Sequence, residues 1–312
     1  MLRWLLPRGE ERRLLGRFYF SDFVGEATNI LLPFEFIFLV LVLESPEWAI
    51  VPLLVEGIAV FLLEIPTGIV ADRFGRKRSV ILGDLLSAFA WALVPLAITF
   101  SGIAQLVAVC ACFALEGLGQ ALVSGADEAW VVDRLDAAKR EDLVDCYYGR
   151  QKSLASLGGV ISGGLALTLL YCSETSLAVL SLLWFVAAAG HALSALLLLP
   201  IPEAPMGEDE ELRGLGFWQR GLTGFRAIWR IGPLLAFFAV MAIVSLATSI
   251  TGDAFELSLL TRGFDVRHFA SISIYDALLG IVTPLLAVAL GRKLGRRAAM
   301  ILLLVLAAAL SC

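Results

Sequence analysis

Long apolar stretches separated by short polar connectors organise this chain. Within each stretch the apolar residues are mostly continuous rather than restricted to one helical face, which is typical of helices that lie in lipid. A helix needs about 20 apolar residues to cross the hydrocarbon core. The pattern predicts spans near residues 18–43, 48–71, 79–100, 103–131, 149–171, 175–199, 232–260 and 268–290, with a ninth beginning near Ala298.

The cations follow the same alternation. Of the 24 Lys and Arg, all but Arg262 and Arg267 precede the first span or lie near connectors that follow even-numbered spans. Membrane proteins retain Lys and Arg on the cytoplasmic side. We therefore expect a multi-pass protein of the inner or plasma membrane with a cytoplasmic N-terminus.

Composition supports this class and disfavours others. The 312 residues are 59% hydrophobic and 17% charged, with mean hydropathy +0.85. Two histidines and five cysteines without metal-ligand spacing predict no metal site and no cofactor. The sequence has no phosphate-binding glycine loop and no nucleophile–His–acid arrangement, so an enzyme is not expected. Cations spread along a membrane face also argue against nucleic-acid binding.

A polar segment divides the chain. We predict an all-α polytopic fold with a six-helix bundle at 1–199, a cytoplasmic linker at 200–231 and an incomplete bundle at 232–312. Within the linker, aromatic and Leu residues recur at helical spacing with arginines between them. This pattern predicts an amphipathic helix that lies either in the headgroup region or on the protein's own cytoplasmic face.

The last apolar stretch is short. Residues 298–312 would form about 22 Å of helix, less than the roughly 30 Å hydrocarbon core. We expect a truncated gene product or a fragment whose native form has further helices.

The connector between the second and third spans carries a distinctive motif. It reads "GIVADRFGRK", with Gly68, Asp72, Arg73, Gly75, Arg76 and Lys77 at fixed spacing. Residues 292–297, "RKLGRR", are a weaker copy after the eighth span, with Arg292 in the place of Asp72. Orientation by charge plus a tight turn is the simpler interpretation. We also expect Gly68 and Gly75 to allow close backbone approach.

This motif resembles the loop motif of the major facilitator superfamily of secondary transporters. The flanking "EIPTG" (64–68) and "SGADEAWVVD" (124–133) are similar to a branch of drug and small-molecule exporters. The resemblance implies twelve helices in two halves, with Asp72 helping to latch the halves on the cytoplasmic side. Two exporter features are absent, since Val160 replaces an expected proline and Phe113 an expected arginine.

Carboxylates at membrane depth are the chemical candidates, because an ionised one costs about 2.5–3.5 kcal/mol there. Asp22, Glu26, Glu35 and Glu116 are the candidates for proton coupling or substrate binding. Asp22 and Glu26 share a helix face at a spacing of four. Glu64, Asp84, Asp127, Asp133 and Arg150 are expected in a cytoplasmic charge network, with Asp133 pairing with Arg150. The glycines of "GVISGG" (159–164) either belong to an antiporter signature or permit close packing.

These observations predict a monomeric transporter that works by alternating access. Its expected partners are the lipid bilayer, a small-molecule substrate and a proton. Proton-coupled export of an amphipathic compound is the first interpretation. Ion-coupled uptake of a nutrient or organic ion, and a truncated paralogue that does not transport, remain the alternatives.

Overall fold

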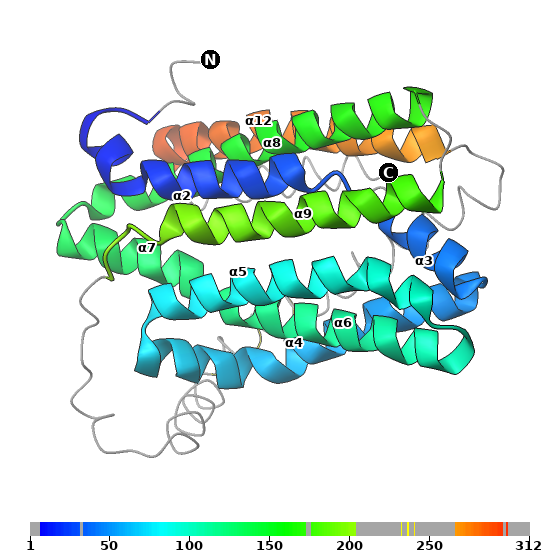
Figure 1. Ribbon diagram of the computed structural model, residues 1–312. Coiled ribbons are helices and arrows are strands. Elements are labelled where there is room, and N and C mark those ends of the chain that lie inside the picture. The colour runs from blue at the N-terminus through cyan, green and yellow to red at the C-terminus, as the bar shows by residue number, and fades with distance from the viewer. Residues whose placement is uncertain are drawn as a thin grey trace.

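The computed structural model describes residues 7–31, 34–172, 176–203 and 266–295, with isolated positions at 232, 236, 240 and 298. Every regular element in these ranges is a helix, and the longest helices run roughly parallel (Figure 1). The elements are α2 Gly9–Thr28, α3 Glu35–Leu43, α4 Pro46–Phe74, α5 Arg76–Leu93, the 3-10 turn η2 Val94–Thr99, α6 Gly102–Val123, α7 Ala126–Ala137, the 3-10 turn η3 Glu141–Leu143, α8 Val144–Cys172, α9 Leu177–Leu198 and α12 Val266–Leu294.

Five stretches in the described part of the chain are long and apolar enough to cross a membrane. They correspond to the predicted second to sixth spans. The helix α12 corresponds to the predicted eighth span. The predicted seventh span, the ninth span and the amphipathic linker helix lie outside the described residues, so the boundaries at 200–231 and 232–312 stay predictions.

The first predicted span, 18–43, is not one helix. The helix α2 begins nine residues earlier, at Gly9, and ends at Thr28, and α3 begins only at Glu35. The Thr28 hydroxyl donates to the carbonyl of Val24 at 2.8 Å, and the amide of Asn29 donates to the carbonyl of Gly25 at 3.1 Å. The sequence has a proline at position 33, which lacks an amide hydrogen and disfavours a helical residue before it.

The fourth predicted span also breaks. The helix α6 ends at Val123, and Gly125 adopts a φ of 71° before α7 begins at Ala126. This left-handed conformation strains any residue with a Cβ. The break therefore redirects the chain, so that α7 is a separate helix that packs beside α5.

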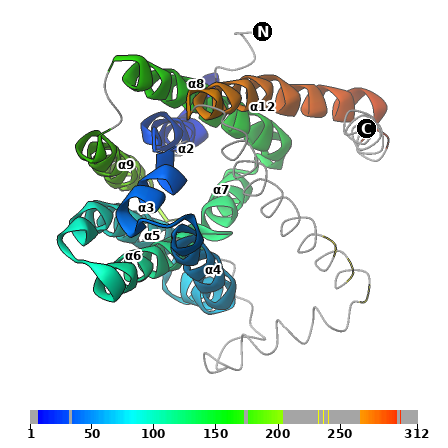
Figure 2. The ribbon, with the colours of Figure 1, turned by 90° about the vertical axis from the view of Figure 1, so that its right-hand side faces the viewer.

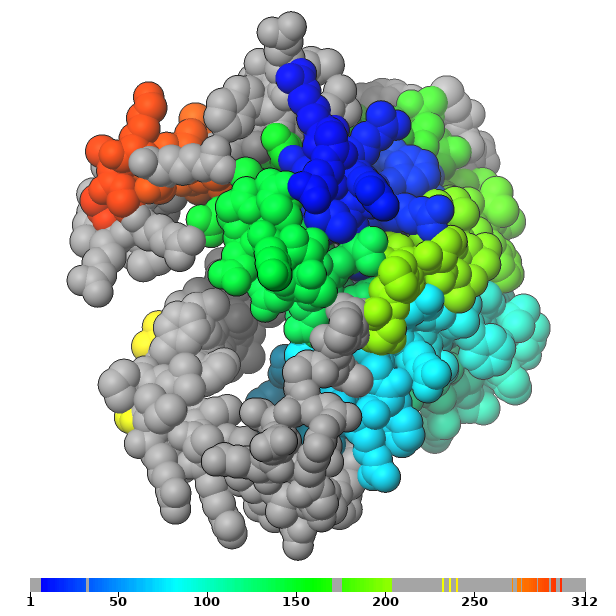
Figure 3. All heavy atoms as spheres, turned by 90° about the vertical axis from the view of Figure 1, so that its left-hand side faces the viewer, coloured from blue at the N-terminus to red at the C-terminus, as the bar shows by residue number. Residues whose placement is uncertain are grey.

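The termini of these helices define one end of the bundle. There α2 begins, α4 ends and α5 begins, α7 ends, and α9 ends (Figure 1). We call this end, which carries Gly75, the motif end; Figure 3 looks onto it.

Two hydrophobic clusters hold the helices from α2 to α9 together. One, at the motif end, is centred on Trp130 of α7, which packs edge-on against Phe18 at a centroid distance of 4.9 Å. The other is centred on Trp184 of α9, whose ring lies 5.3 Å from Phe38 and 6.0 Å from Phe113. Both tryptophans are fully buried. Aromatic pairs of this kind add to the stabilisation from area burial.

Glycines set the closest helix contacts. A Cβ on Gly158 of α8 would lie 2.5 Å from the carbonyl oxygen of Phe23 in α2, and one on Gly163 would lie 2.6 Å from Ile274 in α12. By contrast, Gly164 is open to space among the described residues. Gly158 and Gly163 thus pack α8 between α2 and α12 (Figure 2). Gly158 precedes the "GVISGG" stretch, but Gly163 and Gly159, whose Cβ would lie 3.3 Å from Ala277 of α12, support the packing interpretation of that stretch.

Candidate functional site

The loop motif forms a tight turn between α4 and α5. Its glycine, Gly75, has a φ of 108°, and its amide donates to the carbonyl of Ala71 at 3.0 Å. A Cβ on Gly75 would also lie 2.8 Å from a carboxylate oxygen of Glu203. Glycine is required here by the backbone, since other residues rarely adopt this φ, and a side chain would also displace the carboxylate of Glu203.

Arg76 connects the motif to α7. Its Nη1 lies 2.5 Å from Oδ2 of Asp133 and donates to the carbonyl of Ala129 at 2.8 Å. Its Nη2 is 3.8 Å from Oδ1 of Asp72, one turn earlier. The Asp72 side chain is 69% exposed, whereas Arg76 and Asp133 are 23% and 22% exposed. Arg76–Asp133 is therefore the shielded pair, and Asp72 lies at its edge.

Glu203 completes this turn, and the sequence analysis did not predict it. Its Oε1 accepts a hydrogen bond from the backbone amide of Lys77 at 3.0 Å, and Lys77 Nζ donates to the carbonyl of Leu199 at 2.7 Å. The first turn of α5 has no side-chain cap of its own, so Glu203 supplies the negative charge that a helix N-terminus favours. The signal in the sequence was the position of Glu203 directly after the predicted sixth span, on the side of the membrane where the cations concentrate.

The other motif residues contribute less. Gly68 does not make the expected close approach, because no described atom lies within 4 Å of the position that a Cβ would occupy. Its neighbour Thr67 makes the contact between α4 and α6 instead, with its hydroxyl donating to the carbonyl of Ala121 at 2.7 Å. The guanidinium of Arg73 lies 5.5 Å from the ring centroid of Phe74. Glu64 is exposed.

The expected pairing of Asp133 with Arg150 is wrong. Asp133 binds Arg76, and Arg150 of α8 forms an ion pair with Glu11 of α2. The hydroxyl of Tyr19 also donates to Glu11 at 2.9 Å. The sequence analysis did not single out Glu11, because it lies before the first predicted span. The helix α2 begins early enough to bring Glu11 beside α8.

The Arg76–Asp133 pair gives a direct stability test. The Asp133→Asn variant removes the charge and is expected to lower the free energy of unfolding by about 1–2 kcal/mol, which is a charge-assisted hydrogen bond discounted for partial exposure. Asp136→Asn, an exposed position on the same helix, is the matched control. Thermal unfolding in detergent should separate the two variants; equal melting temperatures would show that the pair does not stabilise the turn.

A second set of polar groups joins α4 to α6, with Gln120 exposed, Glu56 half-buried and Glu116 buried. Gln120 Nε2 donates to Oε1 of Glu56 at 2.5 Å and to Oε1 of Glu116 at 3.3 Å. Glu116 is only 3% exposed, and its Oε2 has no hydrogen-bond partner among the described residues. The amide thus bridges two carboxylates at membrane depth. Glu116 was predicted as a candidate; Glu56 was not singled out.

A third set surrounds His191 of α9. Its Nδ1 is 3.7 Å from Oδ1 of Asp84 in α5, and its ring packs against Trp91 at 4.9 Å. His191 also interacts electrostatically with Glu26 and Glu116. The sequence analysis missed His191, because a lone histidine in an apolar span has no local signature. Its position opposite Asp84 depends on how α5 and α9 pack.

The remaining candidates for proton coupling or substrate binding, Asp22, Glu26 and Glu35, do not form one site. Asp22 of α2 lies within electrostatic range of Asp84 and Asp127, and its Oδ2 has no partner in the described part of the chain. Glu26, one turn further, is exposed. Glu35 stands in the first turn of α3 rather than in the middle of a helix, where a carboxylate is favoured by the helix dipole. The described residues contain no group of three or more potential metal ligands.

Further charge pairs lie at the motif end, where α7, η3 and the start of α2 meet. Arg140, between α7 and η3, binds Asp142 at 2.8 Å and forms an ion pair with Glu10 of α2. These hydrogen bonds, to Asp142 first and Glu10 second, raise the pKa of Arg140 above its ordinary value. Because the Arg140 side chain is partly exposed, the contacts mainly fix where α2 begins relative to η3.

Comparison with known proteins agrees with this architecture. A family model described as Major Facilitator Superfamily matches residues 37–312, which is most of the chain. The comparisons with curated proteins and with solved structures gave no match. The matched range contains the loop motif, the Glu56–Gln120–Glu116 set and His191. The chain therefore belongs to the Major Facilitator Superfamily, as an all-α, multi-pass membrane protein of a family whose members are secondary transporters of small molecules.

Proposed function

We propose that this protein is a proton-coupled secondary transporter that exports a small amphipathic compound by alternating access. The observation that carries the proposal is the Glu56–Gln120–Glu116 set. Two carboxylates of the membrane-crossing helices α4 and α6 share the amide of Gln120, which is exposed, and Glu116 is almost fully buried.

The electrostatics favour a bound proton at this pair. Neither Glu56 nor Glu116 has an ion pair with a Lys or Arg among the described residues. Two negative charges this close in a medium of low polarity repel strongly. One proton shared by the pair removes half of the charge and leaves Gln120 Nε2 a carboxylate oxygen to bind. Loss of that proton restores the repulsion, which gives the pair two distinct states.

We propose that substrate movement is coupled to these two states. The gradient is large enough, since one charge moved through 100 mV corresponds to about 2.3 kcal/mol. Asp22, Glu26, Asp84 and Asp127 are proposed to extend the polar path from the pair toward the motif end, with His191 between them. Glu35 is a secondary candidate for binding a cationic substrate.

Orientation and direction follow from charge and resemblance. We propose that the motif end is cytoplasmic, in an inner or plasma membrane, because the cations concentrate on connectors of that side. The Arg76–Asp133 pair and Glu203 then form the cytoplasmic charge network, with Asp72 available to the second half of the protein. Export is favoured by the similarity of residues 64–68 and 124–133 to the exporter branch, and a monomer is the proposed working unit.

Transport in proteoliposomes tests this proposal. The purified chain is reconstituted, a pH gradient of about two units is imposed, and a panel of fluorescent amphipathic cations and neutral compounds is screened. One coupled proton supports up to about 100-fold accumulation, because each pH unit corresponds to about 1.36 kcal/mol. Accumulation that collapses when an ionophore dissipates the gradient supports the proposal. Flux insensitive to the gradient contradicts proton coupling, and no flux of any compound favours a paralogue that does not transport.

A further inference from the structure

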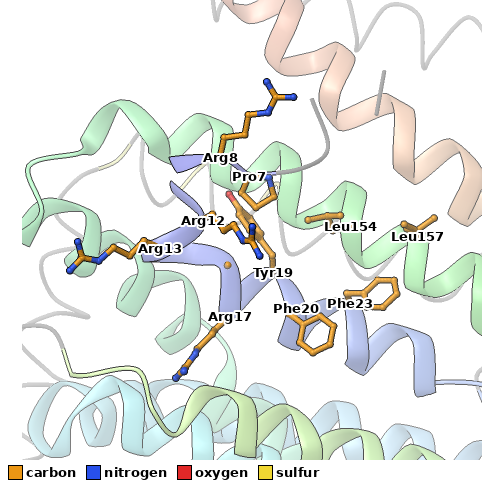
Figure 4. Close-up of a pocket in the computed structure, with 11 residues that line it drawn as sticks. Pro7, Arg8, Arg12, Arg13, Arg17, Tyr19, Phe20, Phe23, Leu154 and Leu157 are labelled. Carbon is orange, nitrogen blue, oxygen red and sulfur yellow. The ribbon is translucent and has the colours of Figure 1, made fainter. Parts of the chain in front are cut away.

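A cleft beside the first turns of α2 is not used by the proposed transport cycle. It has a volume of about 770 Å³ and lies between α2 and α8 at the motif end. Four arginines line it, namely Arg8, Arg12, Arg13 and Arg17. Figure 4 shows the arginine side chains spreading in different directions from the N-terminal part of α2, with Phe20, Phe23, Leu154 and Leu157 further along α2 and α8. We call it the basic cleft.

Among the described residues the four arginines have no acidic partner, so they can bind an external anion. None has an ion pair or hydrogen bond to another side chain in the part of the chain that the structure describes, and all four are exposed. The nearby carboxylates are engaged elsewhere: Glu10 binds Arg140, and Glu11 binds Arg150 and Tyr19. The cleft is therefore lined by four positive charges without a counter-ion among the described residues.

A smaller cavity extends the charged side. It has a volume of about 240 Å³, shares Arg13 and Arg17 with the basic cleft, and adds Arg134 of α7. The Nε of Arg134 is held by a hydrogen bond to the carbonyl of Leu14 at 3.0 Å. Three arginines thus line one small cavity.

The opposite side of the basic cleft is apolar. Phe20 and Phe23 of α2 stack with ring centroids 6.3 Å apart, and they face Leu154 and Leu157 of α8 across the cleft (Figure 4). Phe20 is 52% exposed and Leu157 is 38% exposed. Leu154 and Leu157 belong to α8, which is long and apolar enough to cross a membrane, so the exposed apolar side chains here offer a surface for an acyl chain.

The charged and apolar parts of the basic cleft lie in the same order as the headgroup and the acyl chains of a phospholipid. Along α2 the arginines occupy the turns nearest the motif end, and the phenylalanines follow toward the middle of the helix. Arg17 and Phe23 are separated by about 9 Å along the helix axis, which spans the step from headgroup to acyl chain. A soluble anion would use only the arginines, whereas a phospholipid uses both sides.

We propose that the basic cleft binds an anionic phospholipid, with its phosphate on the arginines and an acyl chain along Phe20, Phe23, Leu154 and Leu157. Basic pockets between membrane helices recognise anionic headgroups in this way, and guanidinium groups bind phosphate oxygens in pairs. The lipid would join α2 to α8 beside the Glu11–Arg150 ion pair. This site requires only that the chain is a membrane protein, and it stands independently of the coupling ion.

Native mass spectrometry of the purified full chain tests the site. The protein is mixed with phosphatidylglycerol or with phosphatidylcholine of the same acyl chains, and bound lipid is counted at increasing collision energy. We expect the wild type to retain phosphatidylglycerol about tenfold better, and the Arg12→Gln/Arg17→Gln variant to lose this preference. Arg78→Gln/Lys139→Gln removes two exposed cations from the same end and is expected to keep it.

Two further arms separate the possible outcomes. Leu157→Trp fills the apolar side and should weaken retention of both lipids while the headgroup preference persists. Glycerol phosphate, which has the anion without acyl chains, should not displace phosphatidylglycerol at equal concentration. Equal retention of both lipids by the wild type, equal losses in the two double variants, or full displacement by glycerol phosphate would each overturn the proposal.

Discussion

Replacing Glu116 with glutamine is expected to abolish gradient-driven accumulation of substrate. The substitution keeps the size of the side chain and its contact with Gln120 but removes the group that takes up a proton. Accumulation of up to about 100-fold under a gradient of two pH units should fall to equilibration. Fluorescence of a transported dye in proteoliposomes measures this directly, with protein content per vesicle checked by densitometry.

The matched control for this variant is Glu47→Gln. Glu47 is an exposed carboxylate in the first turn of α4, the helix that also carries Glu56. It should leave accumulation unchanged. Glu35→Gln is a second comparison, and we expect it to change substrate affinity more than coupling. If Glu116→Gln accumulates substrate as the wild type does, the pair is not the coupling site.

Replacing Gly119 with valine is expected to destabilise the bundle strongly. A Cβ at this position would lie 2.5 Å from Oγ of Ser87 and 2.9 Å from the carbonyl oxygen of Gly83, so α5 and α6 would have to separate. Overpacking costs up to about 3 kcal/mol, which corresponds to a fall in melting temperature of about 6–12 °C for a chain of this size. Thermal unfolding of the detergent-solubilised protein measures the change.

A valine at Gly164 is the control for this effect. Gly164 lies in the interior of α8 with ordinary backbone angles, and no described atom is within 4 Å of its Cβ position. Gly164→Val therefore changes helix propensity in the same way without forcing two backbones apart. Similar melting temperatures for the two variants would mean that the α5–α6 contact tolerates separation.

The apolar pattern was sufficient to predict most of the helices, because membrane spans depend on length and hydrophobicity. Five spans and α12 lie close to their predicted ranges. The breaks at Asn29 and Gly125 were not predicted. Each break depends on the backbone conformation of a few residues inside an apolar stretch. The hydropathy of the stretch stays high when it contains a proline or a glycine, so hydropathy does not reveal such a break.

The loop motif and the buried Glu116 were predictable for different reasons. A motif has fixed spacing, and a lone carboxylate in an apolar helix is conspicuous because of its cost. Partners were less predictable. Glu203 binds Lys77 from 126 positions away, and Arg150 binds Glu11 from 139 positions away. Such pairings depend on where helices begin relative to one another, which a single sequence does not specify.

The central claim is that the Glu56–Glu116 pair holds a proton inside the membrane. Infrared spectroscopy of the reconstituted protein at neutral pH measures this without knowledge of the substrate, since a protonated carboxyl has a C=O stretch that a carboxylate lacks. The account predicts such a band in the wild type and in Glu47→Gln, and its loss in Glu56→Gln/Glu116→Gln. Identical carboxyl bands in all three proteins would contradict it.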